Sequence, residues 1–187
     1  MRETASGELV AVIAYQLDHI DRLYEAVLES IPELSQYETW CHPGYTRDEA
    51  AEYVNWWRKM WNEERAYYLA VEDLQSGEFL GSCGLTDLSV EHRRASLGFW
   101  IRSSRTGKGF ATDAARTVIR LSFEDLGLDR IEIEAAVNNT PSRRIAEKLG
   151  CRLEGILRRR LILPAGPTDT AMYSLLRADS PERSPGS

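Results

Sequence analysis

The sequence predicts an α/β (α+β) fold built on one mixed sheet, and three observations support this prediction. The 187 residues are 43% hydrophobic and 28% charged, close to the averages of globular proteins. One strand–helix–strand unit is recognisable over 96–137. The segments around this unit read as hairpins rather than as further strand–helix repeats. We therefore expect neither a barrel nor a helix bundle.

The first third of the chain predicts a buried strand followed by two helices. The strand covers 9–15, an uninterrupted run of apolar and β-branched residues. Asp18 can cap the first helix, and Pro32 marks its end. Thr46 and Glu49 have the spacing of a capping box, which predicts the start of the second helix. The apolar stripe of the second helix contains Ala50, Val54, Trp57 and Trp61.

The middle of the chain predicts a hairpin and then the strand–helix part of the central unit. The hairpin joins strands over 67–72 and 79–85 through a glycine-containing turn. A strand over 95–101 leads into a helix over 107–125. Gly127 ends this helix, as glycine commonly does just after a helix C-terminus.

The last third predicts a half-exposed strand, a short helix and two further strands. Thr140 and Pro141 supply a cap and a first-turn proline for the short helix. The expected bounds are 130–137 for the strand, 140–150 for the helix, and 152–163 and 170–176 for the last two strands. Residues 1–177 are predicted to form a single domain, and the Ser- and Pro-rich segment 178–187 a disordered tail.

Composition excludes several classes of protein. No apolar run approaches the roughly 18 residues of a membrane helix. The N-terminus also lacks the apolar core of a secretory signal. Three cysteines without paired spacing are typical of reduced thiols, so we expect a cytoplasmic protein. No metal site is predicted, because the three histidines and three cysteines show no ligand spacing.

Charge is distributed unevenly along the chain. The net charge of −6 argues against a nucleic-acid-binding protein. Residues 102–160 nevertheless carry +5, and the remainder carries −11. This basic block indicates an anionic ligand, with a cationic partner elsewhere. The alternative is that both regions are merely solvated faces.

Segment 105–112, Arg-Thr-Gly-Lys-Gly-Phe-Ala-Thr, has the chemistry of a phosphate cradle. Gly107 and Gly109 leave the backbone bare near a predicted helix N-terminus, so successive N–H groups can point at one anion. Arg105 and Lys108 add positive charge. The spacing matches neither a P-loop nor a dinucleotide-binding fingerprint. An ordinary turn before a helix is the alternative interpretation.

Four segments of the second half follow one another in a characteristic order: Leu97-Gly98-Phe99-Trp100-Ile101, then 107–112, 134–142 and 147–151. This order resembles the GNAT family of acyl-CoA-dependent N-acetyltransferases. Asn139 with Ser142, the triplet Leu153-Glu154-Gly155, and the stretch 169–176 are similar to the RimJ/RimL group of that family. Members of this group acetylate α-amines of ribosomal proteins, aminoacyl compounds and some small amines.

The resemblance implies a GNAT-type three-layer fold with helices on both faces of a mostly antiparallel sheet. A splayed parallel pair, here 96–101 and 130–137, opens a slot for acetyl-CoA, with pantetheine on the backbone of strand 96–101 and pyrophosphate on the amides of 106–111. The residues implied to bind the cofactor are Phe99, Trp100, Ile101, Arg105, Thr106, Gly107, Lys108, Gly109, Phe110, Ala111, Asn139 and Ser142.

The resemblance also implies direct transfer of acetyl to an amine, which needs a proton for the leaving thiolate. Many members use a tyrosine at a position that is Ala146 here, which leaves Ser142 as the donor. Asn139 would orient the cofactor amides. The alternative for Asn139 and Ser142 is an ordinary turn and helix cap.

The proton acceptor is not assigned by the resemblance. Ser96 and Leu161 stand where acids are usual in RimL-like sequences. Glu134, with Glu132 on the same strand, is the candidate; the alternative is that both are solvated strand residues. His42 and His92 have suitable unperturbed pKa values but are expected to be loop residues.

The acceptor-binding candidates are Trp40 and Trp56, which lie off the apolar stripe of the second helix and can stack on a ring or cap a cation. Acidic residues nearby, Glu38 among them, suit a positively charged acceptor. The acceptor is expected to be a protein N-terminus or a small amine or aminoacyl compound, and the protein a monomer or homodimer. Two alternative functions stay open: a non-catalytic acyl-CoA-binding sensor or scaffold, and a nucleotide-phosphate-binding protein.

Overall fold

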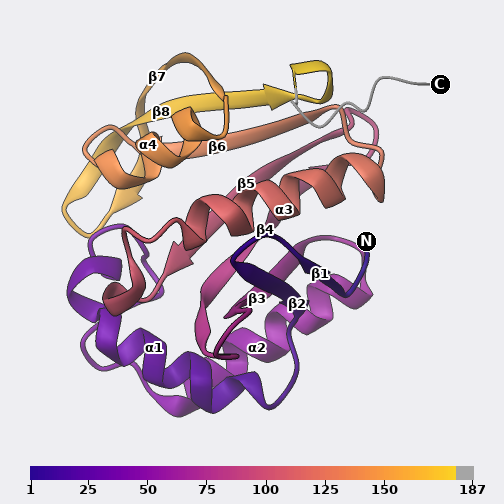
Figure 1. Cartoon of the computed structure of the whole chain (residues 1–187). Coiled ribbons are helices and arrows are strands. Elements are labelled where there is room, and N and C mark those ends of the chain that lie inside the picture. Colours follow the sequence, from indigo (N-terminus) through magenta and orange to yellow (C-terminus); the bar gives the residue numbers. More distant parts are fainter. Residues whose placement is uncertain (180–187) are drawn as a thin grey trace.

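The computed structural model describes residues 1–179 as one sheet between two layers of helices (Figure 1). Helices α1 and α2 cover one face, and α3 and α4 the other. The helices are α1 (His19–Leu34), α2 (Arg47–Asn62), α3 (Phe110–Glu124) and α4 (Thr140–Lys148). The strands are β1 (Thr4–Ser6), β2 (Val10–Ala14), β3 (Tyr67–Asp73), β4 (Phe79–Ser89), β5 (Arg94–Ile101), β6 (Arg130–Ala136), β7 (Arg152–Leu163) and β8 (Gly166–Leu176). The predicted three-layer α/β architecture is confirmed.

The sheet contains the splayed strand pair that the sequence predicts. Its strand order is β1-β2-β3-β4-β5-β6-β8-β7, and every pair is antiparallel except β5 with β6. The parallel register runs only from Arg94 opposite Arg130 to Ser96 opposite Glu132. Beyond Ser96 the two strands separate, while β5 continues to pair with β4 and β6 with β8. One backbone edge of β5 therefore has no neighbouring strand over its last five residues.

Each face of the sheet has its own hydrophobic core. Ala114, Ala115 and Val118, which share one face of α3, are fully buried against the strands. The opposite core, under α1 and α2, is rich in aromatic rings, and its buried or half-buried members include Tyr15, Trp40, Tyr45, Tyr53, Trp57, Tyr68 and Trp100. This aromatic core packs under the loop that joins α1 to α2, so the loop is held against β5.

The predicted start of α2 is confirmed, whereas the predicted cap and end of α1 are not. The capping box of Thr46 and Glu49 is present as predicted. Asp18 precedes α1 but makes no side-chain cap hydrogen bond, and Pro32 lies inside α1 rather than at its end. Pro32 offers no N–H to the carbonyl of Leu28, but the helix continues for two more residues, and the Ser35 N–H bonds to the carbonyl of Ile31 at 3.0 Å.

The start of α3 and the cap of α4 differ from the prediction. Helix α3 starts at Phe110 instead of 107, because Gly107 and Gly109 have φ of +76° and +90° and so are not helical. The cap of α4 is Asn139 and not Thr140: the Asn139 side chain accepts the N–H of Ser142 at 3.1 Å.

The sheet is longer than the sequence predicts. Strand β1 has no counterpart among the predicted strands, β4 runs four residues further to Ser89, and β8 starts at Gly166 instead of 170. Of the predicted disordered tail, Ala178 and Asp179 lie in a short 3₁₀ helix, and 180–187 lie outside the described residues. Among the residues described, no helix is both long and apolar enough to cross a bilayer.

Asp113→Ala should lower the melting temperature by roughly 6–12 °C, a loss of about 3 kcal/mol. The Asp113 carboxylate is 4% exposed and accepts the N–H groups of Glu8, Leu9 and Val10 at 3.1, 2.8 and 3.1 Å. Its removal leaves three backbone donors without a partner where β2 meets the first turn of α3. Thermal unfolding measures the effect, and Arg116→Ala, an exposed change on the same helix, is the control. Equal melting temperatures for the two variants would contradict this account.

Candidate active site

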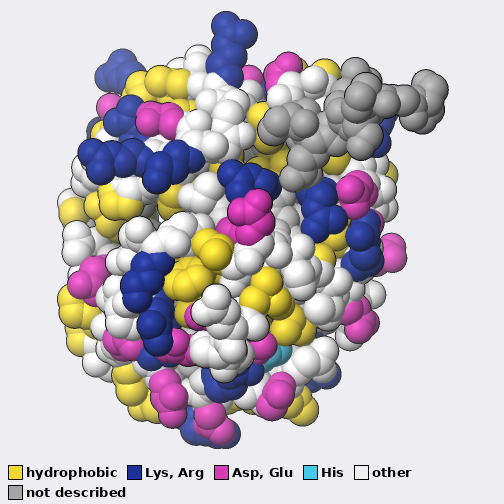
Figure 2. All heavy atoms as spheres, in the orientation of Figure 1, with side chains coloured by type: hydrophobic (Ala, Val, Ile, Leu, Met, Phe, Trp, Pro, Cys, Tyr) yellow, Lys and Arg dark blue, Asp and Glu magenta, His cyan; other side chains and the backbone are white. Residues whose placement is uncertain are grey.

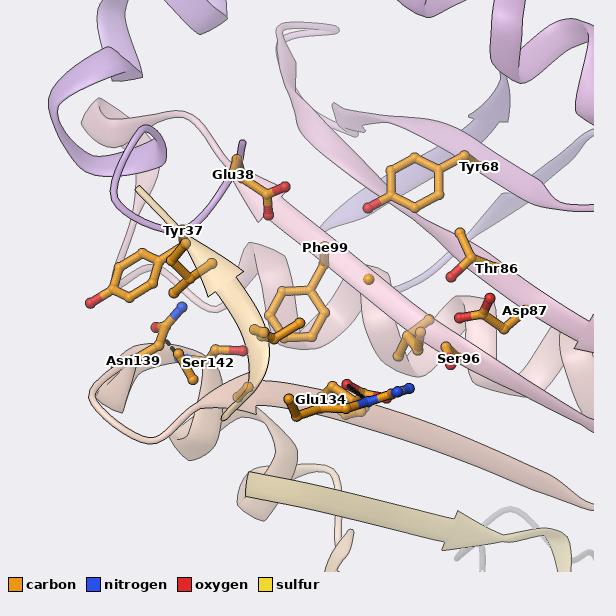
Figure 3. Close-up of a pocket in the computed structure, with 18 residues that line it drawn as sticks. Tyr37, Glu38, Tyr68, Thr86, Asp87, Ser96, Phe99, Glu134, Asn139 and Ser142 are labelled. Carbon is orange, nitrogen blue, oxygen red and sulfur yellow. Dashed lines mark hydrogen bonds and ion pairs between the residues drawn. The ribbon is translucent and has the colours of Figure 1, made fainter. Parts of the chain in front are cut away.

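Two cavities of about 470 and 490 Å³ meet where β5 and β6 separate. The first, called here the acceptor cavity, lies between the splayed strands and is drawn in Figure 3. The second, called the cradle cavity, lies between the loop after α1, the end of β5, and the starts of α3 and α4. The residues that line both are Tyr37, Glu38, Phe99, Asn139 and Ser142. A molecule in either cavity therefore reaches the same junction.

The cradle cavity presents free backbone amides. The first hydrogen bond inside α3 runs from the Asp113 N–H to the carbonyl of Gly109 at 3.0 Å, so the amides of 110–112 precede the helical ladder. The left-handed conformations of Gly107 and Gly109 turn the chain into this helix start. The Thr106 amide, predicted to join the cradle, instead donates to the carbonyl of Ser103 at 3.3 Å. The cradle thus begins after Thr106.

Positive charge reaches the cradle cavity mainly from α4. Arg105 lines the cavity, but its guanidinium pairs with Glu78 at 2.5 Å. Lys108 is exposed and is not among the lining residues. Arg144 and Lys148, which sequence reasoning did not assign, line it. Figure 2 shows Lys and Arg side chains gathered over α4 and beside the turn that precedes α3. Both residues belong to the basic block at 102–160, which is the sequence signal that could have identified them.

The end of β5 supplies the remaining predicted cofactor residues. Phe99, Trp100 and Ile101 all line the cradle cavity, on the strand edge that has no β6 partner. Backbone groups alternate along a strand, and the Arg102 N–H bonds to the carbonyl of Leu80 in β4 at 2.7 Å, so those of Trp100 also face β4. The amide and carbonyl groups of Phe99 and Ile101 face the free edge, where they suit a ligand that contains amide bonds. The indole of Trp100 turns to the other face of the sheet, where it is 5% exposed and packs 6.0 Å from Trp40.

Ser142 and Asn139 lie at the junction of the cavities, as predicted (Figure 3). The interpretation of Asn139 as a helix cap is also correct, because its side-chain oxygen accepts the Ser142 N–H. This bond fixes Ser142 in the first turn of α4 with its hydroxyl available to the cavities. Ala146 is fully buried, so no side-chain hydroxyl comes from that position.

The acceptor cavity is walled by polar groups from separate parts of the chain. Glu38 enters from the loop after α1, Tyr68 from β3 and Asp87 from β4; Figure 3 shows Glu38 near Phe99 and Asp87 beside Thr86 and Ser96. Burial raises the pKa of Glu38, and the indole N–H of Trp40 partly offsets that rise. Burial also raises the pKa of Tyr68 well above its ordinary value, so the phenol is neutral. Glu38 therefore gives the cavity a desolvated carboxyl group, and Tyr68 gives it a neutral phenol.

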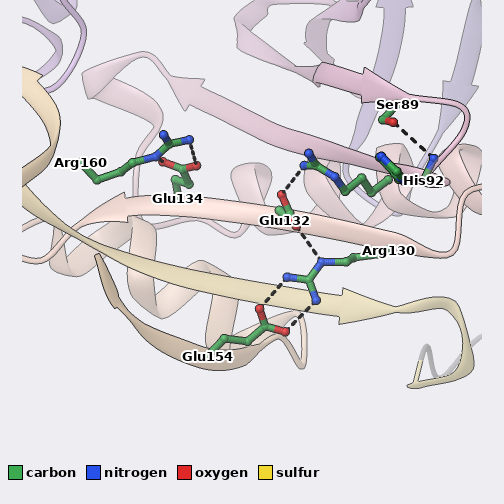
Figure 4. A network of polar contacts seen from close by, with 8 residues as sticks. Ser89, His92, Arg130, Glu132, Glu134, Glu154 and Arg160 are labelled. Atoms are coloured by element: carbon green, nitrogen blue, oxygen red, sulfur yellow. Dashed lines mark hydrogen bonds and ion pairs between the residues drawn. The ribbon is translucent and has the colours of Figure 1, made fainter. Parts of the chain in front are cut away.

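Glu134, the proton acceptor predicted from the sequence, lines the acceptor cavity but is held in an ion pair. Both of its oxygens face the guanidinium of Arg160, at 3.1 and 3.3 Å (Figure 4). Glu132 bonds to Arg94 at 3.0 Å and to Arg130 at 2.7 Å, away from the cavity lining. Glu132 is thus neither in the site nor the solvated strand residue of the alternative interpretation, because its side chain is ion-paired and only 13% exposed.

Neither predicted acceptor tryptophan lines the two cavities. Trp56 is 54% exposed on α2, so the structure does not bring it to the site. Trp40 is half-buried and packs 5.2 Å from Tyr53, but its indole N–H donates to Glu38 Oε2 at 2.8 Å. Trp40 is therefore connected to the site through the Glu38 carboxylate.

His42 and His92 are loop residues, as expected.

Comparison with known protein families identifies the architecture. The family model described as an acetyltransferase (GNAT) domain matches residues 11–152. The chain belongs to the GNAT acetyltransferase family. The matched range contains both cavities' central residues, Phe99, Asn139 and Ser142. GNAT domains bind acetyl-CoA, and the bare amides, free strand edge and α4 cations described above fit the pyrophosphate and pantetheine of that group.

Relatives with curated names are N-acetyltransferases, in agreement with the RimJ/RimL-like resemblance. The "Uncharacterized N-acetyltransferase YoaA" of Bacillus subtilis (strain 168) is 29% identical over 130 residues, covering 70% of this chain and 73% of that protein. The "Ribosomal-protein-serine acetyltransferase" of Escherichia coli (strain K12) is 23% identical over 175 residues, covering 93% and 97%. This GNAT protein is therefore an acetyl-CoA-dependent N-acetyltransferase.

A solved structure shows the same fold with a cofactor bound. RimL, a ribosomal alpha-N-protein acetyltransferase in complex with coenzyme A, superposes with a TM-score of 0.84 at 17% identity, covering 94% of this chain and 98% of that one. Within residues 1–179 no group of three or more acidic, His or Cys side chains is placed to hold a metal ion.

Proposed function

We propose that the protein moves an acetyl group from acetyl-CoA to a primary amine by direct attack of the neutral amine. The junction of the two cavities at Phe99, Asn139 and Ser142 carries this proposal, because it lets two ligands meet from opposite sides of the splayed strands. The cradle cavity suits an anionic, amide-containing ligand, and the acceptor cavity suits a cationic one. No covalent enzyme intermediate is required.

The residues that line the two cavities have separate tasks. Acetyl-CoA supplies the acetyl group as a thioester when bound. The amides of 110–112 with Arg144 and Lys148 hold its phosphates, and the edge of β5 aligns the pantetheine. Asn139 fixes the start of α4, and the Ser142 hydroxyl hands a proton to the leaving sulfur.

Two classes of acceptor fit the acceptor cavity: the N-terminal α-amine of a protein, and a small amine or aminoacyl compound. The named activity of the Escherichia coli relative supports the first class. The cavity volume of about 470 Å³ is large enough for one or two terminal residues or for a small amine. Its acidic side chains, Glu38, Asp87 and Glu134, outnumber its one cation, Arg160, so a protonated amine is favoured at its entrance.

The test is an acetylation screen followed by one substitution. The panel contains hexapeptides that begin with Ser, Ala or Thr, together with spermidine and benzylamine, and release of free CoA thiol is measured. Ser142→Ala should lower kcat for the best acceptor about 100-fold and leave the Kd for acetyl-CoA within about twofold. Ser76→Ala, in the exposed turn before β4, is the control. A wild type that binds acetyl-CoA but acetylates no amine would instead support the non-catalytic sensor.

A further inference from the structure

We infer that Glu38 is the general base of this site and that it accepts the proton of the acceptor ammonium group. The inference rests on the proposed function, since it names a catalytic residue for that reaction. It differs from the expectation drawn from the sequence, which placed this task on Glu134.

Glu38 lies where a base for the incoming amine is needed. It lines both cavities, together with Phe99, Asn139 and Ser142, and Figure 3 shows its carboxylate directed into the space above Phe99. An amine at the junction therefore lies beside this carboxylate. Glu38 is the acidic side chain common to the two cavities, whereas Asp87 and Glu134 line the acceptor cavity alone.

The Glu38 side chain is also held in place. The main chain is fixed by the Glu38 N–H to the carbonyl of Leu34 at 2.8 Å and by the Cys41 N–H to the carbonyl of Glu38 at 3.1 Å. The Trp40 indole N–H binds Oε2 at 2.8 Å, and Trp40 itself is wedged between Tyr45, Tyr53 and Trp100. Oε2 is thereby occupied, which leaves Oε1 to take a proton from the amine.

The surroundings of Glu38 favour proton transfer near neutral pH. Burial raises its pKa toward the range in which a carboxylate is both ionised and basic enough to act. The titratable groups whose pKa values Glu38 raises are neutral: Cys41 in the same loop, Tyr53 from α2 and Tyr68 from β3. In the cradle cavity, which Glu38 also lines, the charged groups are Glu33 from α1, Arg105 from the turn before α3, and Arg144 and Lys148 from α4. The charged groups on the other walls of the acceptor cavity are Asp87 from β4, Glu134 from β6 and Arg160 from β7.

Glu134 is the competing candidate, and its contacts make it the weaker base. Its two oxygens are each within 3.3 Å of Arg160, so a proton on Glu134 would break an ion pair. A proton on Glu38 weakens one hydrogen bond, from the uncharged indole of Trp40, and breaks no ion pair. The structure therefore favours Glu38 as the group that changes its protonation state.

The reaction balances with Glu38 in this role. The ammonium gives one proton to the Glu38 carboxylate, and the freed nitrogen lone pair forms the C–N bond to the acetyl carbon. The C–S bond breaks, and the sulfur takes the second nitrogen proton through Ser142. Glu38 then returns its proton to solvent, so each turnover yields an acetamide, CoA thiol and one proton.

Glu38→Gln is the decisive variant, because glutamine still accepts the Trp40 N–H but cannot take a proton. With the acceptor that the wild type uses fastest, we expect kcat/KM at pH 7 to fall about 100- to 1,000-fold, with the Kd for acetyl-CoA within about threefold. The loss should shrink about tenfold per pH unit as the pH approaches the amine pKa, because free amine then forms without a base. Glu25→Gln, on the exposed face of α1, is the control.

Trp40→Phe gives a second readout that a purely structural role would not produce. Without the indole N–H, the Glu38 carboxylate loses the contact that stabilises its charge, so the acidic limb of the kcat/KM profile should move to higher pH. A Glu38→Gln loss that does not change with pH would overturn the inference, as would a pH-rescued loss in Glu134→Gln but not in Glu38→Gln. Absence of turnover in the wild type would instead count against the proposed function.

Discussion

Gly109→Val should weaken acetyl-CoA binding about 30-fold or more, equivalent to about 2 kcal/mol. Gly109 has φ of +90° immediately before Phe110, and a β-branched residue does not adopt this conformation. The chain must therefore rotate at the start of α3, which turns the amides of 110–112 away from a common anion. The fall in affinity results from the changed direction of these amides and not from a steric clash, because only Leu9, 3.4 Å away, lies near the added Cβ.

The matched control for Gly109→Val lies at the other end of the same helix. Gly127 also has positive φ, at +63°, and no atom lies within 4 Å of the position that its Cβ would occupy. Gly127→Val should impose a similar backbone strain and a similar loss of thermal stability, but leave the affinity for acetyl-CoA unchanged. Calorimetric titration and thermal unfolding of both variants make the comparison. Equal affinities for acetyl-CoA in the two variants would show that the amides of 110–112 do not bind the cofactor.

Gly98→Ala should lower kcat/KM for the amine about 100-fold while the Kd for acetyl-CoA stays within about threefold. A Cβ at Gly98 would lie 2.8 Å from the hydroxyl oxygen of Tyr68, and both residues line the acceptor cavity. Tyr68 cannot move away easily, because its ring stacks on Trp57 with 4.5 Å between centroids. The new methyl group therefore fills space between the separating strands β5 and β6 that the amine needs.

The double variant Gly98→Ala/Tyr68→Phe separates steric blockage from other causes. Removing the Tyr68 hydroxyl removes the atom that meets the new methyl group, so kcat/KM should recover at least about tenfold from the Gly98→Ala level. Steady-state kinetics of the wild type, both single variants and the double variant complete the cycle. A double variant as slow as the product of the two single losses would contradict steric blockage.

The features predicted correctly from the sequence are those that depend on local chemistry. Gly107 and Gly109 predict a bare turn before a helix start, and their positive φ values agree, while the binding of phosphate by this turn stays a prediction. Asn139 and Ser142 follow from the order of motifs, and their separation of three residues is that of a cap and the amide it binds. The aliphatic stripe of α3 predicts its buried face for the same reason.

The features that the sequence does not predict depend on contacts between distant segments. In the sequence Glu38 is only one of several acids near the second helix, and the packing of Trp40 on Trp100 is what brings its loop to β5. Trp56 faces solvent because the inward stripe of α2 is already filled. The pairing of Glu134 with Arg160 joins β6 to a strand residue 26 positions later and has no local signature.

The central claim is that the slot between β5 and β6 binds acetyl-CoA through the cradle and the free edge of β5. Calorimetric titration of the wild type with acetyl-CoA, and with ATP as the comparison, tests it most directly. ATP offers adenine and phosphates but no pantetheine to pair with Phe99 and Ile101. We predict a Kd for acetyl-CoA in the micromolar range and no measurable heat with ATP. No binding of acetyl-CoA, or equal binding of ATP, would contradict the assignment of the slot and of every residue placed in it.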